Sequence, residues 1–338
     1  MSSTENVYIK KMNRKIYMLA GLVAALALIY TATLIFEPER INTRDANYAW
    51  LDEKRVEQAD RIELVHDGTS INLARKSGEW FVTRDGVDYP AKQLRVEDLL
   101  HVLSTKAPYL LRGSSSHERF GLTEDSADRI VIQGGLSETP LLDLLVGDAD
   151  SLGAVYMRKY NQDEVRSSAS STIASYALSS VTSWYNLRLF PDTENASIGV
   201  DAVQRIVIHA PPTASDTNGE EETPPAPASE QTLTRNGSGW LVSDSSGERD
   251  ADVQQVESYI RGLLDIEGDD FVTSIQASDP VFDVGWVRLE LGNGSNRVIR
   301  LGPPVENNRH SAIAEGGNAR IGFVFALSEW RKNTLFTF

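Results

Sequence analysis

Hydrophobic and polar residues alternate in two stretches of the chain that read alike. Residues 61–64 (Arg-Ile-Glu-Leu) are echoed by residues 205–208 (Arg-Ile-Val-Ile), and each stretch predicts a strand with one buried face. A turn and a tryptophan follow each strand, at Trp80 and Trp240. The pattern therefore predicts that one structural unit occurs twice.

A helix is predicted after each of these tryptophans. Apolar residues recur there at spacings of three, four and seven, which gives an amphipathic helix with a single buried stripe. The stripe comprises Val96, Leu99, Leu100 and Leu103 in the first helix and Val256, Tyr259, Ile260 and Leu263 in the second. Two further strand-like runs follow each helix, and the GDADSLG segment at 147–153 is interpreted as a turn rather than a calcium-binding loop.

Each predicted unit closes with a tryptophan followed by Leu-Phe. These repeat markers are Trp184, Leu189 and Phe190 in the first copy and Trp330, Leu335 and Phe336 in the second. Because turn-like segments rather than crossover helices join the strands, the sheets are expected to be antiparallel and the class α+β. We therefore predict two homologous α+β repeats, at 50–192 and 198–338.

Several segments modify this pattern. The Pro-rich, acidic stretch 211–230 predicts a surface loop inserted into the first hairpin of the second repeat. The Ser-rich stretch 167–180 predicts a short helix, because its apolar residues recur at helical spacing. Trp80 and Trp240 are interpreted as core anchors rather than as ligand-stacking residues. The apolar chain end, LFTF, is expected to pack against the fold, or alternatively to dock on a partner.

The longest apolar run, residues 16–36, contains no charged residue. At 1.5 Å per residue it spans about 31 Å, which matches the ~30 Å hydrocarbon core of a bilayer. A cleaved signal peptide is the alternative, but its apolar region would be about 7–15 residues long. We predict a transmembrane helix, anchored by Ile16, Leu19, Leu22, Val23, Leu26, Leu28, Ile29, Leu34, Ile35 and Phe36.

The charges that flank this run predict its orientation. Residues 1–15 are basic (KKMNRK lies just before the run), whereas EPER after it has two glutamates and one arginine and so no excess of positive charge. By the positive-inside rule, residues 1–15 are cytoplasmic, 37–49 form a linker, and the bulk of the chain lies outside the cytoplasm. The sequence thus predicts a single-pass protein of a bacterial inner membrane with a periplasmic body.

The net charge and the motifs of the sequence argue against several kinds of binding and catalytic site. The net charge is −15 and the chain has no cysteine, which argues against nucleic-acid binding and against disulfides or thiolate metal sites. The five histidines show no metalloprotease spacing, and there is no nucleophile elbow or phosphate-binding loop. We therefore expect no catalytic, cofactor-binding or metal site, and a protein that is not an enzyme.

A set of features occurs in one order along the chain: the N-terminal apolar segment, the strand with Gly-x-Trp, the helix after it, Phe120-Gly121-Leu122, and the apolar-Gly turn at 144–147 followed by Tyr156-Met157-Arg158. In these features the chain resembles the domain-of-unknown-function 4340 family of bacteria. The second copy departs from it, with Phe-Asp-Val-Gly in place of Phe-Gly-Leu.

The resemblance implies a non-enzymatic accessory subunit of an ABC transport system of the gliding-motility type. The implied partners are an ABC permease, an ATPase subunit and a second extracytoplasmic auxiliary protein. The alternative is an extracytoplasmic binding module for an envelope glycan or peptide, held in a cleft between the two repeats. An envelope hydrolase with paired carboxylates is a third hypothesis, although no spacing singles out a pair.

Overall fold

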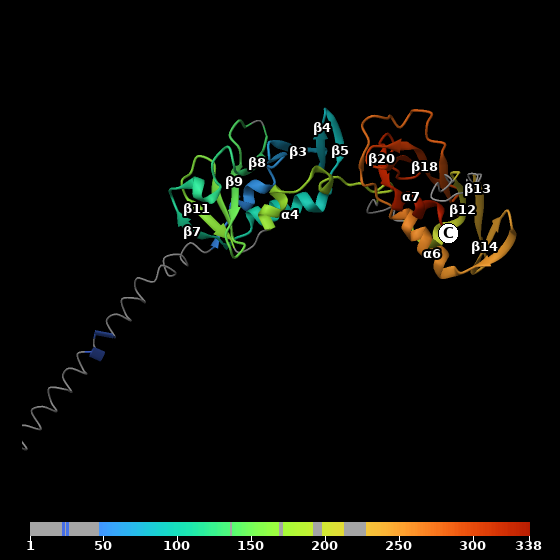
Figure 1. The fold of residues 1–338 in the computed structure, drawn as a ribbon, viewed down its shortest axis with the longest axis horizontal. Coiled ribbons are helices and arrows are strands. Elements are labelled where there is room, and N and C mark those ends of the chain that lie inside the picture. The colour runs from blue at the N-terminus through green and yellow to red at the C-terminus, as the bar shows by residue number, and fades with distance from the viewer. Residues whose placement is uncertain are drawn as a thin grey trace, which may run out of the picture. The chain divides into compact units, whose positions relative to one another are not determined.

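The computed structural model describes residues 22–23, 25–26, 47–135, 137–168, 172–191, 198–212 and 228–338. The chain divides into two compact units, of which unit 1 ends at Trp184 and unit 2 begins at Tyr185. Each unit contains one large antiparallel sheet of nine strands, together with helices (Figure 1). The predicted α+β class with antiparallel sheets is therefore confirmed for the described residues.

The elements of unit 1 are, in chain order, β1 (Asn47–Tyr48), α3 (Glu53–Val56), β2 (Arg61–His66), β3 (Thr69–Lys76), β4 (Glu79–Arg84), β5 (Val87–Pro90), α4 (Gln93–Ser104), β6 (Ala107–Pro108), β7 (Leu110–Gly113), η1 (His117–Phe120), β8 (Asp128–Gln133), β9 (Leu142–Ala149), β10 (Val155–Lys159), β11 (Val165–Ser168), α5 (Thr172–Ala177) and η2 (Val181–Ser183).

The elements of unit 2 are η3 (Val200–Ala202), β12 (Val203–Ala210), β13 (Ser229–Asn236), β14 (Gly239–Asp244), β15 (Gly247–Ala251), α6 (Val253–Leu264), β16 (Asp270–Phe271), β17 (Gly285–Leu291), β18 (Asn296–Val305), β19 (Arg309–Glu315), β20 (Phe325–Ser328) and α7 (Glu329–Phe336).

The strand order is the same in both sheets. Unit 1 has β5-β4-β3-β2-β8-β9-β10-β11-β7, and unit 2 has β15-β14-β13-β12-β17-β18-β19-β20-β16. The main helix also comes at the same point of the chain, since α4 follows β5 and α6 follows β15. Positions in one unit can therefore be compared with positions in the other through their strand register.

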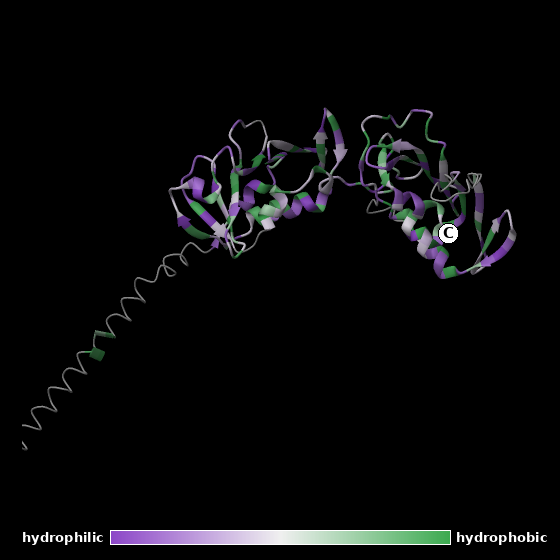
Figure 2. Ribbon diagram, in the orientation of Figure 1, coloured by the Kyte–Doolittle hydropathy of each residue, from purple (hydrophilic) through white to green (hydrophobic). Residues whose placement is uncertain are grey.

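The core of each unit lies where the predicted helix stripe meets the sheet. All four predicted stripe residues of α4 are buried, and in α6 Val256, Ile260 and Leu263 are buried. Each strand contributes alternate residues, as Ile62 and Leu64 do in β2. Figure 2 shows the resulting mixture of hydrophobic and hydrophilic colours along the strands and helices of both units.

The Ser-rich stretch and the GDADSLG segment have the predicted local structures. Within the first, residues 172–177 form α5, whose buried residues are Ile173, Ala174 and Ala177, whereas Ser167 and Ser168 belong to β11. The second forms a turn between β9 and β10, in which the Asp150 carboxylate accepts hydrogen bonds from the N–H groups of residues 152 and 154.

The predicted closing landmark of the repeat is wrong. Trp184 comes after α5 and η2, whereas Trp330 lies within α7, directly after β20. Because β11 and β20 hold the same place in their sheets, α7 corresponds to α5, and Trp184, which follows α5, does not correspond to Trp330, which lies within α7. Leu189 is already part of unit 2, where its N–H donates to the Ile266 carbonyl oxygen. The two Trp-Leu-Phe patterns are thus similar in sequence but occur in different local structures.

Three predicted boundaries also change. The first unit ends at Trp184 rather than at residue 192. The linker predicted at 37–49 is not loop throughout, because Asn47 and Tyr48 form β1 and pair with β6. The insert predicted at 211–230 ends earlier, since β13 begins at Ser229. Residues 213–227 of the insert lie outside the described residues.

The predicted transmembrane helix at 16–36 lies largely outside the described residues. Of its positions, 22, 23, 25 and 26 are described; they are helical and exposed. Within the parts of the chain that the structure describes, no helix is both long enough and apolar enough to cross a membrane.

Candidate functional site

A cavity of about 660 Å³ opens on the inner face of the sheet in unit 1. It lies at one end of the neighbouring strands β2, β3 and β4, and residues 178–181, which follow α5, form its other wall. We call it the unit 1 cavity. Its volume falls in the usual range of small-molecule and peptide pockets, about 300–1,000 Å³.

The alternation of the strands explains which side chains reach the cavity. His66 continues the inward row of Ile62 and Leu64 on β2, and Arg84 continues the row of Val82 on β4. His66 and Arg84 lie at the ends of their strands, beyond the buried residues of the same face. The cavity is therefore the place where the hydrophobic face of the sheet extends beyond its helical cover.

The floor and one wall of the cavity are apolar. Ile71 and Val82 are buried beneath it, and Leu178 at its edge is 50% exposed. Two hydroxyl groups at the rim are engaged by carboxylates: Ser70 donates to Glu63 and Thr83 donates to Asp88. Neither of these two hydroxyls donates to a histidine.

The charges at the rim of the cavity pair with one another. His66 Nδ1 lies 2.7 Å from Asp128 Oδ1, and His66 Nε2 lies 3.5 Å from Asp67 Oδ2. The hydrogen bond to Asp128 and the two negative charges raise the pKa of His66, against a smaller opposing effect of burial. Arg84 Nε lies 3.7 Å from Asp85 Oδ2. The paired rim favours an uncharged ligand group in the cavity.

Sequence reasoning did not find this site. His66 is one of five scattered histidines in the sequence and belongs to no motif. One signal was available: His66 falls in phase with two buried residues, so the strand pattern alone places it on the inner face.

The tryptophans that served as repeat markers have different environments. Trp80, Trp184 and Trp240 are buried, as the interpretation of Trp80 and Trp240 as core anchors requires. Trp330 is 72% exposed and borders a second cavity, of about 400 Å³, between α6 and α7. Tyr259, Leu263 and Leu335 also line this cavity. We call it the α6–α7 groove.

The remaining markers are buried or partly buried in unit 2. Leu189, Phe190 and Leu335 are buried, and Phe336 is partly exposed. The Tyr259 hydroxyl donates to the Leu335 carbonyl oxygen, and the Phe338 ring lies 5.6 Å from the Tyr259 ring. Burial raises the pKa of Tyr259. The prediction that the LFTF chain end packs against the fold is therefore confirmed.

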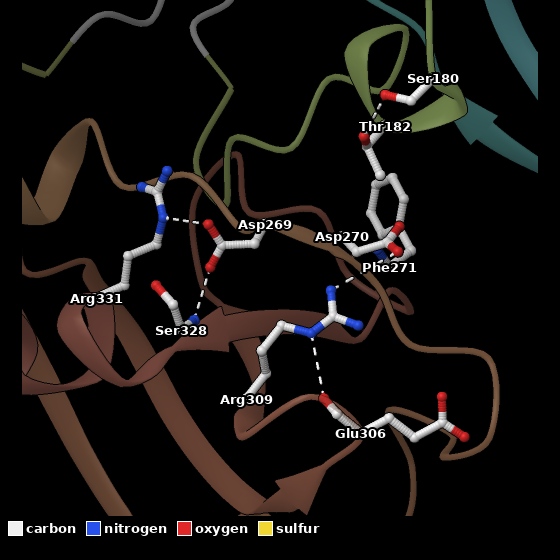
Figure 3. A network of polar contacts seen from close by, with 9 residues as sticks. All are labelled: Ser180, Thr182, Asp269, Asp270, Phe271, Glu306, Arg309, Ser328 and Arg331. Atoms are coloured by element: carbon white, nitrogen blue, oxygen red, sulfur yellow. Dashed lines mark hydrogen bonds and ion pairs between the residues drawn. The ribbon is translucent and has the colours of Figure 1, made fainter.

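A polar network fixes the start of α7 to β16 (Figure 3). The Asp269 carboxylate accepts hydrogen bonds from the Ser328 N–H at 2.6 Å and from Arg331 Nε at 2.9 Å. Next to it, Arg309 Nη1 lies 3.8 Å from Asp270 Oδ2. Burial alone would raise the pKa of Asp269, but the two donors outweigh it and lower that pKa. The network positions α7 and with it one wall of the α6–α7 groove.

An aromatic cluster holds the first described residues of the body of unit 1. The Trp50 ring lies 5.0 Å from the Tyr48 ring and 5.3 Å from the Tyr109 ring, each in an edge-to-face arrangement. The Arg166 guanidinium lies 4.1 Å from the centre of the Tyr48 ring and is itself buried. The chain that enters from the N-terminal side is therefore tied into unit 1 at residue 47.

Over the described residues, no group of three or more His, Asp or Glu side chains has the geometry of a metal site. The five histidines are dispersed. His66 and His310 each contact a carboxylate within 3.1 Å, while His101 is exposed and contacts Thr105.

Comparison with known families gives one match. The family described as Domain of unknown function (DUF4340) matches residues 80–283, which is more than half of the chain. The match is a single stretch that runs from unit 1 into unit 2, so it does not by itself identify the two units as two copies of one domain. No curated protein and no solved structure matches the chain.

Proposed function

The chain belongs to the family described as Domain of unknown function (DUF4340), and on that premise we propose that it is a non-enzymatic accessory subunit of an ABC-type transport complex. In this proposal, residues 16–36 anchor it in a bacterial inner membrane and both units lie in the periplasm. The permease and ATPase subunits, and a second extracytoplasmic auxiliary protein, are its partners. The shared strand order supports an origin of the two units by duplication.

The observation that carries the proposal is the attachment of unit 1 directly after the apolar segment. Pairing of β1 with β6 and the cluster around Trp50 fix the chain from Asn47 onward. Residues 37–46 alone then separate unit 1 from the predicted anchor, and ten extended residues reach at most about 35 Å. A tether of this length would keep unit 1 beside a membrane-embedded permease.

The exposed Trp330 supports a protein contact on unit 2. Large aromatic side chains are enriched at the energetic centres of interfaces, and an exposed tryptophan beside an apolar groove is the kind of surface that a partner covers. We propose that the α6–α7 groove contacts another subunit of the complex.

Purification of the full chain from its native membrane in a mild detergent tests this function. We expect the permease and the ATPase to copurify with the wild-type chain, and Trp330→Ala to reduce their yield several-fold. A matched control is Leu152→Ala, which removes another strongly exposed hydrophobic residue, this one in the β9–β10 turn. Recovery of a monodisperse free chain alone, from membranes that contain the transporter, would refute the proposal.

A second candidate, the binding module, is favoured by the unit 1 cavity. The sequence places such a site between the repeats, whereas the cavity lies within unit 1 and is lined by its residues alone. The two functions are compatible, because an accessory subunit can hold a ligand. They are separated by whether substitutions at the cavity alter ligand binding while the transporter subunits still copurify.

A further inference from the structure

The two units differ at the place where unit 1 has its cavity. Val65 pairs with Arg129 in unit 1, and His209 pairs with Trp286 in unit 2. The next positions are therefore His66 and Asp128 in unit 1, which correspond to Ala210 and Gly285 in unit 2. The register of the neighbouring strand agrees, because Asp128 pairs with Val146, Gly285 pairs with Leu301, and a glycine follows each partner.

In unit 2 this place is covered by the chain's own end. A Cβ atom on Gly285 would lie 3.1 Å from Cζ of Phe336, so the phenylalanine ring rests over the glycine. Helix α7 packs against β12, and the Tyr259 hydroxyl holds the Leu335 carbonyl. The Leu-Phe segment thus acts as an internal ligand on the inner face of its sheet.

In unit 1 the equivalent helix has one aromatic residue, Tyr176, but its ring packs against Trp184 and Arg95 and does not line the cavity. Helix α5 packs against β2 and β8 but ends at Ala177, and the half-exposed Leu178 stands at the edge of the open cavity. The nearest following aromatic residue, Trp184, packs elsewhere: its ring lies 4.7 Å from the Arg95 guanidinium, near the beginning of α4. Among the described residues, no Phe, Tyr or Trp lines the cavity above the hydrophobic floor formed by Ile71 and Val82.

We propose that the unit 1 cavity binds a peptide segment bearing an aromatic or large aliphatic side chain, which takes the place that Phe336 holds in unit 2. The paired charges at the rim select against a phosphate or a free carboxylate, and the apolar floor selects against a sugar. The inference rests on the binding role proposed for the cavity, and it requires no transporter partner.

Binding of a synthetic peptide to the detergent-solubilised full chain tests the proposal. The probe is a fluorescently labelled octapeptide with the sequence of residues 331–338, RKNTLFTF, measured by fluorescence anisotropy. We expect saturable binding that Leu178→Glu weakens at least tenfold, because the substitution places a charge at the apolar wall. Leu152→Glu is the matched control, since Leu152 is 91% exposed in the β9–β10 turn, and it should bind as the wild type does.

Two further measurements test whether the peptide binds through its phenylalanines and where on the chain it binds. A peptide in which both phenylalanines are replaced by serine should not bind. A photoreactive benzoylphenylalanine at the first phenylalanine should cross-link to residues 66–85 or 178–181. Absence of binding, equal binding by the Leu178→Glu chain, or cross-links confined to unit 2 would each overturn the proposal. None of these results would alter copurification of the permease, so the transporter role is tested separately.

Discussion

Gly302 and Phe282 are in close contact in unit 2: a Cβ atom on residue 302 would come within 2.7 Å of Cδ1 of the Phe282 ring. The corresponding pair in unit 1 is Gly147 and Phe120, where a Cβ on Gly147 would overlap the Phe120 carbonyl oxygen. Both glycines follow the strand residue that pairs with the first position of the neighbouring strand. The Phe-Gly-Leu and Phe-Asp-Val-Gly segments, which differ as sequences, therefore pack against equivalent glycines, the first through its backbone and the second through its phenylalanine ring.

These close contacts predict that adding a methyl group at either glycine lowers the free energy of unfolding. Gly147→Ala and Gly302→Ala should each destabilise their unit by about 1–3 kcal/mol, because backbone or a buried ring must move to admit the Cβ. The measurement is the thermal unfolding transition of the full chain. Gly262→Ala on α6 is the control; its Cβ meets nothing within 4 Å, and it should stabilise the protein by about 0.5–1 kcal/mol. Equal midpoints for all three variants would contradict the packing role.

The pair His66–Asp128 predicts a pH dependence of stability in unit 1. The pKa of His66 is raised above its usual value of 6.5, so the folded state binds the proton more tightly than the unfolded state does. The pair therefore contributes its full stability below about pH 6.5, and the contribution is lost as the pH rises through the pKa of the folded state.

The test compares wild type with His66→Gln by thermal unfolding at pH 5.5 and pH 8.5. We expect the variant to be less stable than wild type at pH 5.5 and the difference to shrink at pH 8.5. Other groups titrate equally in both chains, so the change in the difference reports His66. A difference that is constant, or that grows with pH, would argue against a protonated histidine in this pair.

Much of the fold could be predicted because it depends on local periodicity. The stripe of α4, three of the four stripe residues of α6 and the alternation of β2 follow from the spacing of apolar residues, and the structure confirms them. In β12 the predicted alternation is wrong, because Ile206, Val207 and Ile208 are all buried. The predicted closing landmark was wrong because it rested on matching residue types and not on a repeating spacing of apolar residues. Trp184 and Trp330 are each followed five residues later by Leu-Phe, yet Trp184 is buried and Trp330 is exposed. Whether a single tryptophan is buried or exposed depends on the helix, strand or loop that carries it, which the residue alone does not reveal.

The candidate site could not be predicted because its residues meet only through the sheet. His66, Val82 and Leu178 come from β2, β4 and the segment after α5, and no local pattern connects them. The polar network around Asp269 has the same character, since its partner Arg331 lies 62 positions away in the sequence.

This network predicts that Asp269 anchors α7. Asp269→Asn should lower stability by ~1 kcal/mol, because the side chain loses its charge-assisted bond with Arg331. Amide hydrogen exchange across residues 329–336 should accelerate in the variant. The pKa of Asp269 is lowered by its donors, so the difference from wild type should be present above pH 4 and should vanish as the pH falls through the pKa of the folded state.

Asp283→Asn is the matched control for this substitution. Asp283 also faces an arginine in unit 2, but its contact with Arg300 is 3.9 Å long and its side chain is strongly exposed. Exposed pairs of this kind contribute ~0–1 kcal/mol, so the control should leave the exchange of α7 unchanged. If both variants exchange alike, Asp269 does not hold the helix.

The contrast between two tryptophans of unit 2 predicts which one maintains the fold. Trp240 is 2% exposed and packs beneath the Arg235 guanidinium, 4.7 Å from its ring, whereas Trp330 is 72% exposed. Trp240→Ala should therefore cost about 3–5 kcal/mol, and Trp330→Ala should leave the unfolding midpoint close to that of wild type. The measurement is thermal unfolding of the full chain, made beside the copurification experiment. If Trp330→Ala unfolds as readily as Trp240→Ala, a loss of partners in that variant would reflect a damaged unit 2, and the α6–α7 groove would no longer be supported as a contact surface. If stability is kept while the partners are lost, the tryptophan serves the contact and not the core.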